Sequence, residues 1–498
     1  MKLTTESIWA NLGEFERAAR ALHHEPYALY RDFYVGGERP LRYIRKNSRE
    51  SDEHWLERLG RLVGANYCAP IVNKPVQAEY GARVRRSVAN PQLQARLEAI
   101  ARSNALHTFQ LKTARQRAID GCAIVQVYWD PGFAVCDFRF AIAEDTEGAP
   151  GASAGPSANR QSEIGNRKSA GGLRLKHILP EHFFPIVLDD CERLDAVIVD
   201  RGEVPTTTTR TGTGTRTGTT ARRVEIYTPE DIAVYEDGVR VNEPVGYGVL
   251  PFVVFNGRRL VGDVFGHSML RGIAELNHAL NESINNVLEI LRFQAFSLLV
   301  IQGGMQGLPT DAEGRPRLAI GEAGFLNVDS DGRVYFADPN PKIGEVLAVI
   351  ERLIGMMYET GSIPVAVVQP QQSHAESAAS RAIQFMPLVD LVEELITFDT
   401  ESERELIEKM LLVDATHRSG PTTLAEVREG MGALAVEFPR SFLPTDEAAR
   451  FELLRAKREA GLLTRRMMLA AERPELGEAE LDALEAQLDA QGPRGARA

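Results

Sequence analysis

The longest amphipathic segment of the chain runs from residue 266 to residue 297. Its apolar side chains recur every three or four residues, the spacing that places them along one side of an α-helix. They are Leu270, Ile273, Leu276, Leu280, Ile284, Leu288 and Leu291. At 1.5 Å per residue, a helix of about 31 residues reaches roughly 46 Å. Because this length exceeds the span of a small domain, the pattern predicts a helix that extends beyond the body of its subunit.

Three asparagines, Asn277, Asn281 and Asn285, follow one another at every fourth residue beside this apolar stripe. Asparagine is a mediocre helix former, and its amide needs hydrogen-bond partners. An isolated monomer would gain little from such a row, whereas a ring of identical subunits could use it for contacts between neighbouring helices. An ordinary amphipathic core helix with a hydrated side fits the same periodicity, so both interpretations stay open.

Before this segment the pattern predicts short helices and then short strands. The predicted helices are residues 6–20, residues 55–66 and two segments within residues 91–118. The predicted strands are residues 122–129, 135–141, 183–188, 196–200, 224–227, 232–235 and 252–255. Asp130-Pro131-Gly132 predicts a hairpin between the first two strands. Short strands separated by turns are typical of antiparallel sheets.

After the amphipathic segment at residues 266–297, turn signals divide residues 298–341 into short strands, and helical periodicity returns at residues 343–357. The order is therefore a long helix, a small β unit and a second helix. If the two helices pack antiparallel, the β unit lies at their far end. A further long helix is predicted from Ala375 to His417, with a kink at Pro387 because proline lacks the backbone donor and clashes with the preceding turn.

The C-terminal region is predicted to be mainly helical. A short strand is expected at residues 436–438, and Thr445 caps a helix that stops at Gly461. Leu481, Leu484 and Leu488 mark one last helix.

Two segments of low complexity, residues 144–172 and 205–220, interrupt the β-rich region. The first is dominated by Gly, Ala, Ser and Asn and the second by Thr and Gly. Neither has enough apolar side chains to order itself, so both are expected to be flexible surface insertions.

Composition indicates a soluble globular chain of two to four domains, because 44% of its 498 residues are apolar and 25% are charged. The net charge of −12 argues against a protein that coats DNA, but it allows DNA to slide past an acidic wall. Residues 375–418 hold ten acids and four bases. Such a run is usually a solvated face, and it could also be an acidic surface along a channel.

Targeting and redox signals are absent from the sequence. Cys68, Cys122, Cys136 and Cys191 show no CxxC spacing and are expected to be buried reduced thiols of a cytosolic protein. Residues 1–20 are mixed in charge, so no signal peptide is expected. No membrane span is expected either, since even the most apolar window, residues 284–301, contains charged side chains.

No catalytic, cofactor or metal signature was found. GxxxxGK[ST] and HExxH are absent. His23 and His24 are adjacent and point in different directions, which favours solvation over metal binding. We therefore expect neither an enzyme nor a bound cofactor. A hydrolase that uses paired carboxylates is a remote alternative, because no Asp or Glu pair has a telling spacing.

Several segments together resemble the portal proteins of tailed bacteriophages. In the tail, a proline and an acidic cap open a helix that leads into Gly-Leu-Leu-Thr-Arg-Arg at residues 461–466, followed by Pro-Glu-Leu at residues 474–476 and an acidic helix. Also similar are the helix at residues 266–291, the β unit behind it, DPNPKIGEVL at residues 338–347 and TGSIP…SAASRAIQ at residues 360–384. The order of these features matches the family over roughly residues 30–490, whereas the two low-complexity segments have no place in its pattern.

The resemblance implies an α+β portal fold and a homo-oligomeric ring, usually of twelve subunits, at the capsid vertex of a virion assembled in the host cytoplasm. The implied divisions are a β-rich and helical wing with flexible insertions, an antiparallel helical stem, a small clip, a tunnel loop, a kinked helix and a helical crown. The wing would be residues 1–265, and the stem helices would be residues 266–297 and 342–360, on either side of the clip at residues 298–341. The tunnel loop would be residues 361–374, the kinked helix residues 375–419 and the crown residues 420–498.

The resemblance also implies the function and the partners. Double-stranded DNA would be packaged and ejected through the ring. The large terminase would dock on the clip, and the other partners would be major capsid and scaffold proteins and a head-completion or tail adaptor protein, with no membrane involved. A different capsid or connector protein is the closer alternative to this reading.

We expect the tunnel loop to line the narrowest part of the channel, where neutral side chains would touch the DNA backbone without trapping it. An ordinary interdomain loop is the alternative. The candidate DNA-facing residues are Val365, Val367, Val368, Gln369, Gln371, Gln372, Ser373 and His374.

Overall fold

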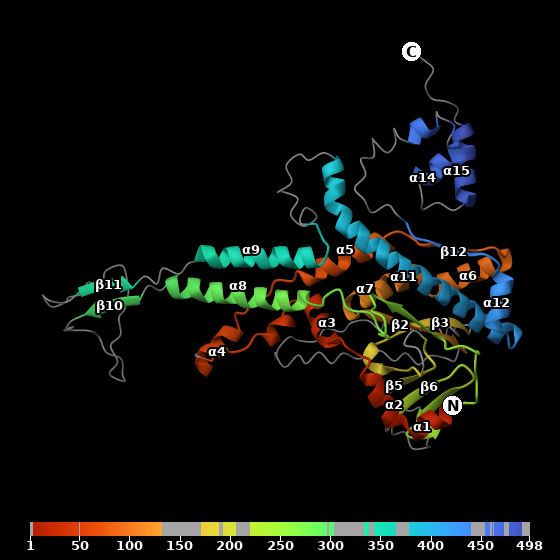
Figure 1. Ribbon diagram of the computed structural model, residues 1–498, viewed down its shortest axis with the longest axis horizontal. Helices are drawn as coiled ribbons and strands as arrows, with labels where there is room; N and C mark the ends of the chain where they lie inside the picture. Colours follow the sequence, from red (N-terminus) through yellow and green to blue (C-terminus); the bar gives the residue numbers. More distant parts are fainter. Residues whose placement is uncertain are drawn as a thin grey trace, which may run out of the picture. The chain divides into compact units, whose positions relative to one another are not determined.

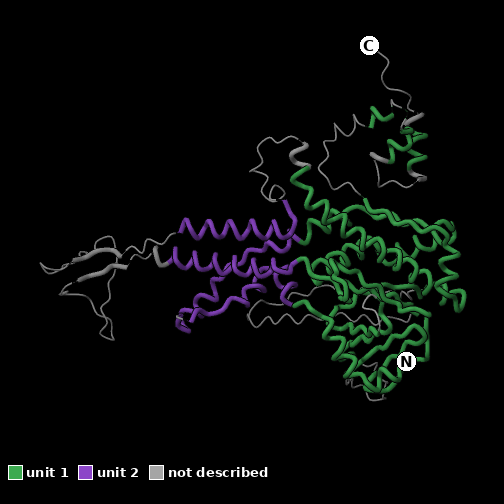
Figure 2. Tube along the Cα trace, viewed as in Figure 1, with its two compact units in different colours: residues 1–27, 72–269, 366–498 green, residues 28–71, 270–365 purple. Residues whose placement is uncertain are grey.

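The computed structural model shows an α+β protein with antiparallel sheets, as predicted (Figure 1). It divides into two compact units (Figure 2). Unit 1 comprises Met1–Tyr27, Val72–Met269 and Ala366–Ala498, and unit 2 comprises Ala28–Ile71 and Leu270–Val365. The residues that the structure describes are 3–48, 50–131, 171–188, 193–205, 220–295, 298–302, 333–337, 343–364, 378–439, 454–458, 461, 463–472 and 478–490.

Unit 1 contains most of the described helices and strands. Its helices are α1 (Thr5–Ala10), α2 (Leu12–Arg20), most of α5 (Cys68–Tyr80), α6 (Pro91–Ser103), α7 (Leu106–Asp120), α11 (Ala378–Ser419), α12 (Leu424–Met431), α14 (Arg465–Glu472) and α15 (Glu478–Ala490). A short 3-10 turn, η2, spans Pro180–His182.

Three antiparallel sheets belong to unit 1. The order β3-β2-β9 joins Gly172–Ile178, Cys122–Asp130 and Phe252–Asn256. The order β4-β5-β6-β7-β8 joins Phe183–Ile186, Ala196–Pro205, Thr220–Tyr227, Ile232–Glu236 and Val239–Arg240. The third pairs β1 (Arg85–Val88) with β12 (Leu434–Glu437).

Side-chain alternation along the strands builds these elements into layers, because successive residues of a strand point to opposite faces. On β2, Ala123 and Val125 pack against α6 and α11, whereas Cys122 and Ile124 face the five-stranded sheet. The far face of that sheet, which includes Ile198, is covered by α1 and α2. Unit 1 is therefore a helix, sheet, sheet, helix stack.

Unit 2 is built around two long helices, α8 (Ile273–Ala295) and α9 (Ile343–Thr360), which pack together. Between them in sequence, β10 (Leu298–Gln302) and β11 (Arg333–Ala337) pair antiparallel. The other described elements are α3 (Tyr27–Val35), the 3-10 turn η1 (Pro40–Tyr43) and α4 (Asp52–Leu59).

Most of the predicted elements are confirmed, with shifts of a few residues. The two helices within residues 91–118, the helix at residues 343–357 and the last helix are present as α6, α7, α9 and α15. The strands predicted at residues 122–129, 183–188, 196–200, 224–227, 232–235 and 252–255 are present as β2, β4, β5, β6, β7 and β9. The predicted residues 436–438 overlap β12.

Other boundaries need correction. The helix predicted at residues 6–20 breaks at Asn11, whose side chain donates to Ser7 O, because asparagine competes with the helical backbone at such positions. The long helix predicted from Gly266 begins at Ile273, after Gly272 adopts a φ of 77° that ends the preceding turn. The helix predicted at residues 55–66 is present as α4, which ends at Leu59, so residues 60–66 lie outside it.

The β-region differs from expectation in its strand pairing, whereas α11 agrees with the predicted long helix. β2 pairs with β3 and β9, whereas its predicted hairpin partner, residues 135–141, lies outside the described residues. So do the insertion at 144–172, except for its last two residues, and residues 206–219 of the second insertion. Helix α11 runs unbroken through Pro387 and changes direction in its N-terminal part (Figure 1). Cys68 and Cys122 are buried free thiols.

Candidate functional site

Asn277, Asn281 and Asn285, here called the asparagine ladder, bind an extended segment of their own chain. Each side-chain oxygen accepts one backbone N–H from residues 63–67. The distances are 2.9 Å from Tyr67 to Asn277, 2.8 Å from Ala65 to Asn281 and 2.9 Å from Val63 to Asn285. Two of the amides also donate back, Asn277 to Ala65 O at 2.9 Å and Asn285 to Val63 O at 2.8 Å.

The ladder works because two spacings nearly coincide. Residues four apart on a helix are separated by about 6 Å along its axis. Alternate residues of an extended chain are separated by about 6.6 Å. A row of asparagines on α8 can therefore present an acceptor to every second peptide group of residues 63–67, much as a neighbouring strand would.

In the described structure these hydrogen bonds lie within the chain, as in the core-helix alternative, and contact with a neighbouring subunit stays a prediction. All three side chains are buried within the chain. Their carbonyl oxygens are occupied by intrachain N–H donors, because a buried amide is costly unless it is hydrogen-bonded. Their role in the described structure is to hold residues 63–67 against α8.

A polar cluster next to the ladder fixes α4 on α8. Arg58 donates to Asn286 Oδ1 at 3.1 Å and to Glu50 Oε2 at 3.3 Å. Nδ1 of His54 lies 2.6 Å from Glu50 Oε1. Burial opposes ionisation of Glu50, but hydrogen bonds from His54 and Asn47 and the charge of Arg58 outweigh it and lower the pKa of this carboxyl group.

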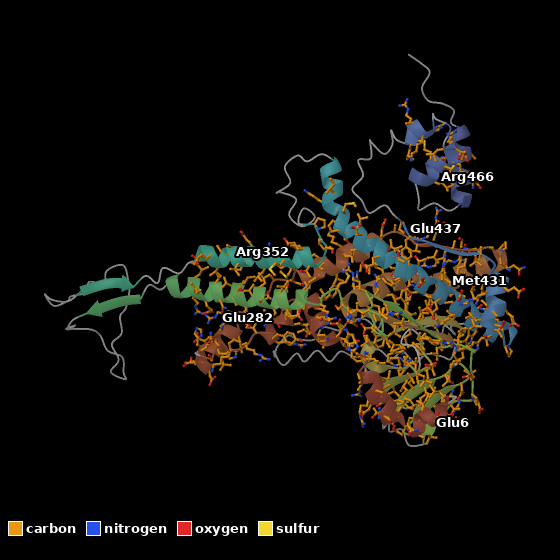
Figure 3. All side chains as sticks on the ribbon, viewed as in Figure 1. Glu6, Glu282, Arg352, Met431, Glu437 and Arg466 are labelled. Atoms are coloured by element: carbon orange, nitrogen blue, oxygen red, sulfur yellow. The ribbon has the colours of Figure 1, made fainter. Side chains whose placement is uncertain are left out.

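Helix α9 leaves apolar side chains exposed on two sides. Its buried residues Met357 and Tyr358 lie near its C-terminal end. Leu347 is 47% exposed, Val349 54% and Met356 37%. Leu347 and Met356 are nine residues apart, about two and a half helical turns, so they lie on opposite sides of α9. Figure 3 marks the charged residues Arg352 on α9 and Glu282 on α8.

Helix α8 also exposes apolar side chains, beyond the end of the ladder. Leu288 and Leu291 are exposed, as is Val63 where residues 63–67 begin. Val63 binds Asn285, one turn before Leu288, so an apolar surface continues past the last asparagine. Apolar side chains gathered on exposed helix surfaces are typical of protein contact sites.

The predicted DNA-facing residues cannot be placed against these helices. All of them, from Val365 to His374, lie outside the described residues, as do residues 303–332 of the predicted clip. For the clip, the structure describes the antiparallel pairing of β10 with β11.

Unit 1 contains a cavity of about 480 Å³ between β9 and α11. Its apolar part includes Leu250, Phe252 and Phe398. Its charged part includes Lys409, which donates to Phe252 O at 2.5 Å and pairs with Glu405 at 2.6 Å. The described residues that line it include a serine but no histidine or cysteine, so no nucleophile with an adjacent imidazole base is assembled there.

The described residues include neither a metal-binding group nor a membrane-spanning helix. No group of three or more His, Cys, Asp or Glu side chains there is arranged to hold a metal ion. No described helix combines the length and the hydropathy needed to cross a membrane.

Solved structures resemble this chain. One, titled "Virion of native gene transfer agent (GTA) particle", is 13% identical with a TM-score of 0.42, covering 85% of this chain and 93% of that chain. "Neck of empty GTA particle computed with C6 symmetry" is 13% identical with a TM-score of 0.43, covering 86% and 94%. "Neck of native GTA particle computed with C12 symmetry" is 14% identical with a TM-score of 0.41, covering 81% and 89%. No family model matches the sequence, and no curated protein matches it.

Helix α11 carries buried polar residues that the sequence did not lead us to expect. The acidic run at residues 375–418 was expected to be a solvated face or a channel wall. Three of its carboxylates, Asp399, Glu403 and Asp414, are instead buried. They continue the spacing of the apolar residues Leu395 and Leu406, so carboxylates that interrupt an apolar stripe were the signal that could have revealed them.

Proposed function

We propose that this chain is the subunit of a portal ring, through which double-stranded DNA enters and leaves a phage-like capsid. The observation that carries the proposal is the α8–α9 pair. Two long helices pack together, an antiparallel β-pair lies between them in sequence, and apolar side chains stay exposed along both helices. This is the order of stem, clip and stem that the sequence resemblance implies.

The two apolar sides of α9 fit a cyclic assembly. In a ring each subunit contacts two neighbours through two different surfaces, whereas a two-fold dimer uses the same surface twice. Leu347 lies on one side of α9, and Val349 and Met356 lie on the other. The internal use of the asparagine ladder is compatible with this arrangement, because it leaves the apolar side chains to contact the neighbours.

Within this proposal, residues 361–374 form the tunnel loop and the β10–β11 region forms the docking site of the large terminase. Capsid, scaffold and adaptor proteins would contact the rest of the ring. The chain itself would supply a conduit, and the terminase would supply the energy for packaging.

Ring assembly tests the proposal directly. The purified full-length chain is expected to elute as a high-mass species by light scattering and to appear as a ring with a central hole by negative-stain microscopy. Val349→Asp should reduce assembly at least tenfold, because a new carboxylate in a buried interface must be desolvated without a partner.

Val261→Asp is the matched control. Val261 is 99% exposed in unit 1, so the same substitution there should leave the ring mass unchanged. A wild-type chain that stays monomeric at high concentration contradicts the proposed function. A ring that tolerates Val349→Asp contradicts the assignment of this α9 side to the interface.

A further inference from the structure

A buried polar cluster joins α11 to three other elements of unit 1. Its side chains are buried except for that of Arg86, which is 11% exposed. They come from α5, β1, α7 and α11, and we call them the α11 cluster. Its members are Glu79, Tyr80, Arg86, Gln110, Arg117, Asp399 and Glu403.

Glu403 is fully supplied with donors. Arg86 binds both of its oxygens, with the Nε to Oε2 distance at 2.8 Å. Gln110 donates to Oε1 at 2.9 Å, whereas the Tyr80 hydroxyl lies nearer to Asp399 Oδ2, at 3.0 Å, than to Glu403 Oε1, at 3.3 Å. This set of donors stabilises the ionised carboxylate, so Arg86 and Glu403 balance one another as an ion pair.

The remaining charges do not balance. Arg117 donates to Glu79 Oε2 at 2.6 Å, and its other terminal nitrogen pairs with Asp399. One guanidinium therefore faces two carboxyl groups. An unpaired negative charge inside a protein is costly to desolvate, and a carboxyl group in that situation takes up a proton instead.

We propose that the α11 cluster retains one proton at neutral pH and that the carboxyl group of Glu79, which shares Arg117 with Asp399, holds it. The proton makes the cluster electrically neutral, with two guanidiniums against two carboxylates. It also allows one carboxyl to donate a hydrogen bond within the site, which ties α5 to α11.

The pKa directions agree with this assignment. Burial raises the pKa of Glu79 well above its ordinary value, Arg117 partly offsets the rise, and the charge of Asp399 adds to it. Burial and the charges of Asp399 and Glu403 keep Tyr80 protonated by raising its pKa.

A histidine and a phenylalanine also neighbour the cluster, next to Arg86 and Tyr80 respectively. His107 on α7 has a pKa lowered by burial and by the charges of Arg83 and Arg86. The ring of Phe438 packs edge-on against Tyr80 and carries no charge. Among the described residues, the ion pairs of Glu79 and Asp399 are both with Arg117.

Because the pKa of Glu79 is raised in the folded chain, the stability of that chain depends on pH. The contribution of Glu79 to stability is fully present below the pKa of an unfolded glutamic acid. It is lost as the pH rises toward the folded-state pKa, because the unfolded chain releases the proton first. Over that window the unfolding equilibrium constant rises about tenfold per pH unit from this group.

The experiment is to count protons released when the full chain unfolds in guanidinium chloride at pH 7. Wild type should release about one proton more than Glu79→Gln, since the glutamine keeps an oxygen acceptor for Arg117 but cannot ionise. Asp399→Asn should likewise release about one proton fewer than wild type on unfolding. Glu401→Gln, which changes an exposed carboxylate of the same helix, should release as many protons as wild type.

Equal proton release from wild type and a folded Glu79→Gln variant would overturn the proposal. Circular dichroism checks the fold of each variant. If neither cluster variant folds, infrared spectroscopy of wild type decides, because a protonated carboxyl has a C=O stretch that a carboxylate lacks. Absence of that band at pH 7 would also overturn the proposal.

Discussion

At the scale of single residues, the asparagine ladder lets a helix pair with an extended chain. A side-chain amide offers a carbonyl acceptor and N–H donors, the same groups that a peptide bond offers. Asn285 uses both, since it accepts from Val63 N–H and donates to Val63 O and to Asn281 O at 2.7 Å. Asn281 accepts from Ala65 N–H, but its buried Nδ2 has no hydrogen-bond partner.

This difference predicts unequal costs for the two alanine substitutions. Asn285→Ala should destabilise unit 2 by about 1–3 kcal/mol, because it removes two partly buried hydrogen bonds to the backbone of Val63. Asn281→Ala should cost less, because it also removes an amide donor that is unsatisfied in the wild type. Amide hydrogen exchange checks both, with faster exchange expected at Val63 in the first variant and at Ala65 in the second.

Asn286→Ala is the matched control, because Asn286 is adjacent, exposed and bonded to Arg58 rather than to residues 63–67. It should leave exchange at both amides unchanged. If Asn285→Ala also left the Val63 amide protected, the ladder would not be what holds this segment.

The spacing of the asparagines was visible in the sequence, but their partners were not. Periodicity shows that three amides share a side of one helix. Their partners lie more than 200 positions earlier, where Leu59, Leu62 and Val63 continue the apolar spacing of a helix. Polarity alone does not distinguish an amide that binds its own chain from one that binds a neighbour.

At the scale of elements, apolar spacing located helices and strands and failed where one residue set the local backbone. Residues 266–272 contain apolar side chains in register with α8, yet Gly272 ends the preceding turn with a positive φ. β3 was missed because it directly follows the low-complexity segment and mixes charged with apolar residues. α5 was missed because Pro75, inside it, is normally a sign that a helix has ended.

Pro387 divides α11 into an exposed and a buried part. Ile383 and Met386 before it are exposed, whereas Leu388 and Leu391 after it are buried. Pro387→Ala restores an N–H that can bond to the carbonyl of Ile383. The variant should gain roughly 1–3 kcal/mol of local helix stability. The expected measurement is slower amide exchange across residues 384–390.

Pro421→Ala provides the control for this substitution. Pro421 is exposed and lies between α11 and α12, so its replacement changes the entropy of the unfolded chain without adding a helical hydrogen bond. Exchange across residues 384–390 should then match wild type. Unchanged exchange in Pro387→Ala itself would show that packing of the buried part, and not the missing donor, sets the direction of α11.

At the scale of the whole molecule, the α+β class and the antiparallel sheets followed from short alternating strands between helices. The assignment of chain segments to the two units did not follow from the sequence. Unit 2 combines α8 and α9 with residues 28–71, which sequence reasoning had placed in the N-terminal wing. That association depends on hydrogen bonds from single asparagines to a distant backbone, and no local pattern encodes such long-range contacts.

The proposed tunnel loop gives the prediction that belongs to the assembled ring. Gln369, Gln371 and Gln372 can touch a phosphate backbone without a full ionic bond, whereas arginine forms charge-assisted, bidentate bonds with phosphate. Replacing all three glutamines with arginine should leave the ring mass unchanged and slow DNA packaging severalfold, because every subunit would add tight contacts that must break at each step.

Salt separates this electrostatic effect from a folding defect. Packaging by the arginine variant should recover as the salt concentration is raised from about 50 mM to about 200 mM, since phosphate contacts weaken steeply over that range. Replacing the same three glutamines with asparagine keeps neutral amides at these positions, so this control should package normally at both salt concentrations. If the arginine variant packaged at the wild-type rate in low salt while its ring was intact, residues 365–374 would not line the path of the DNA.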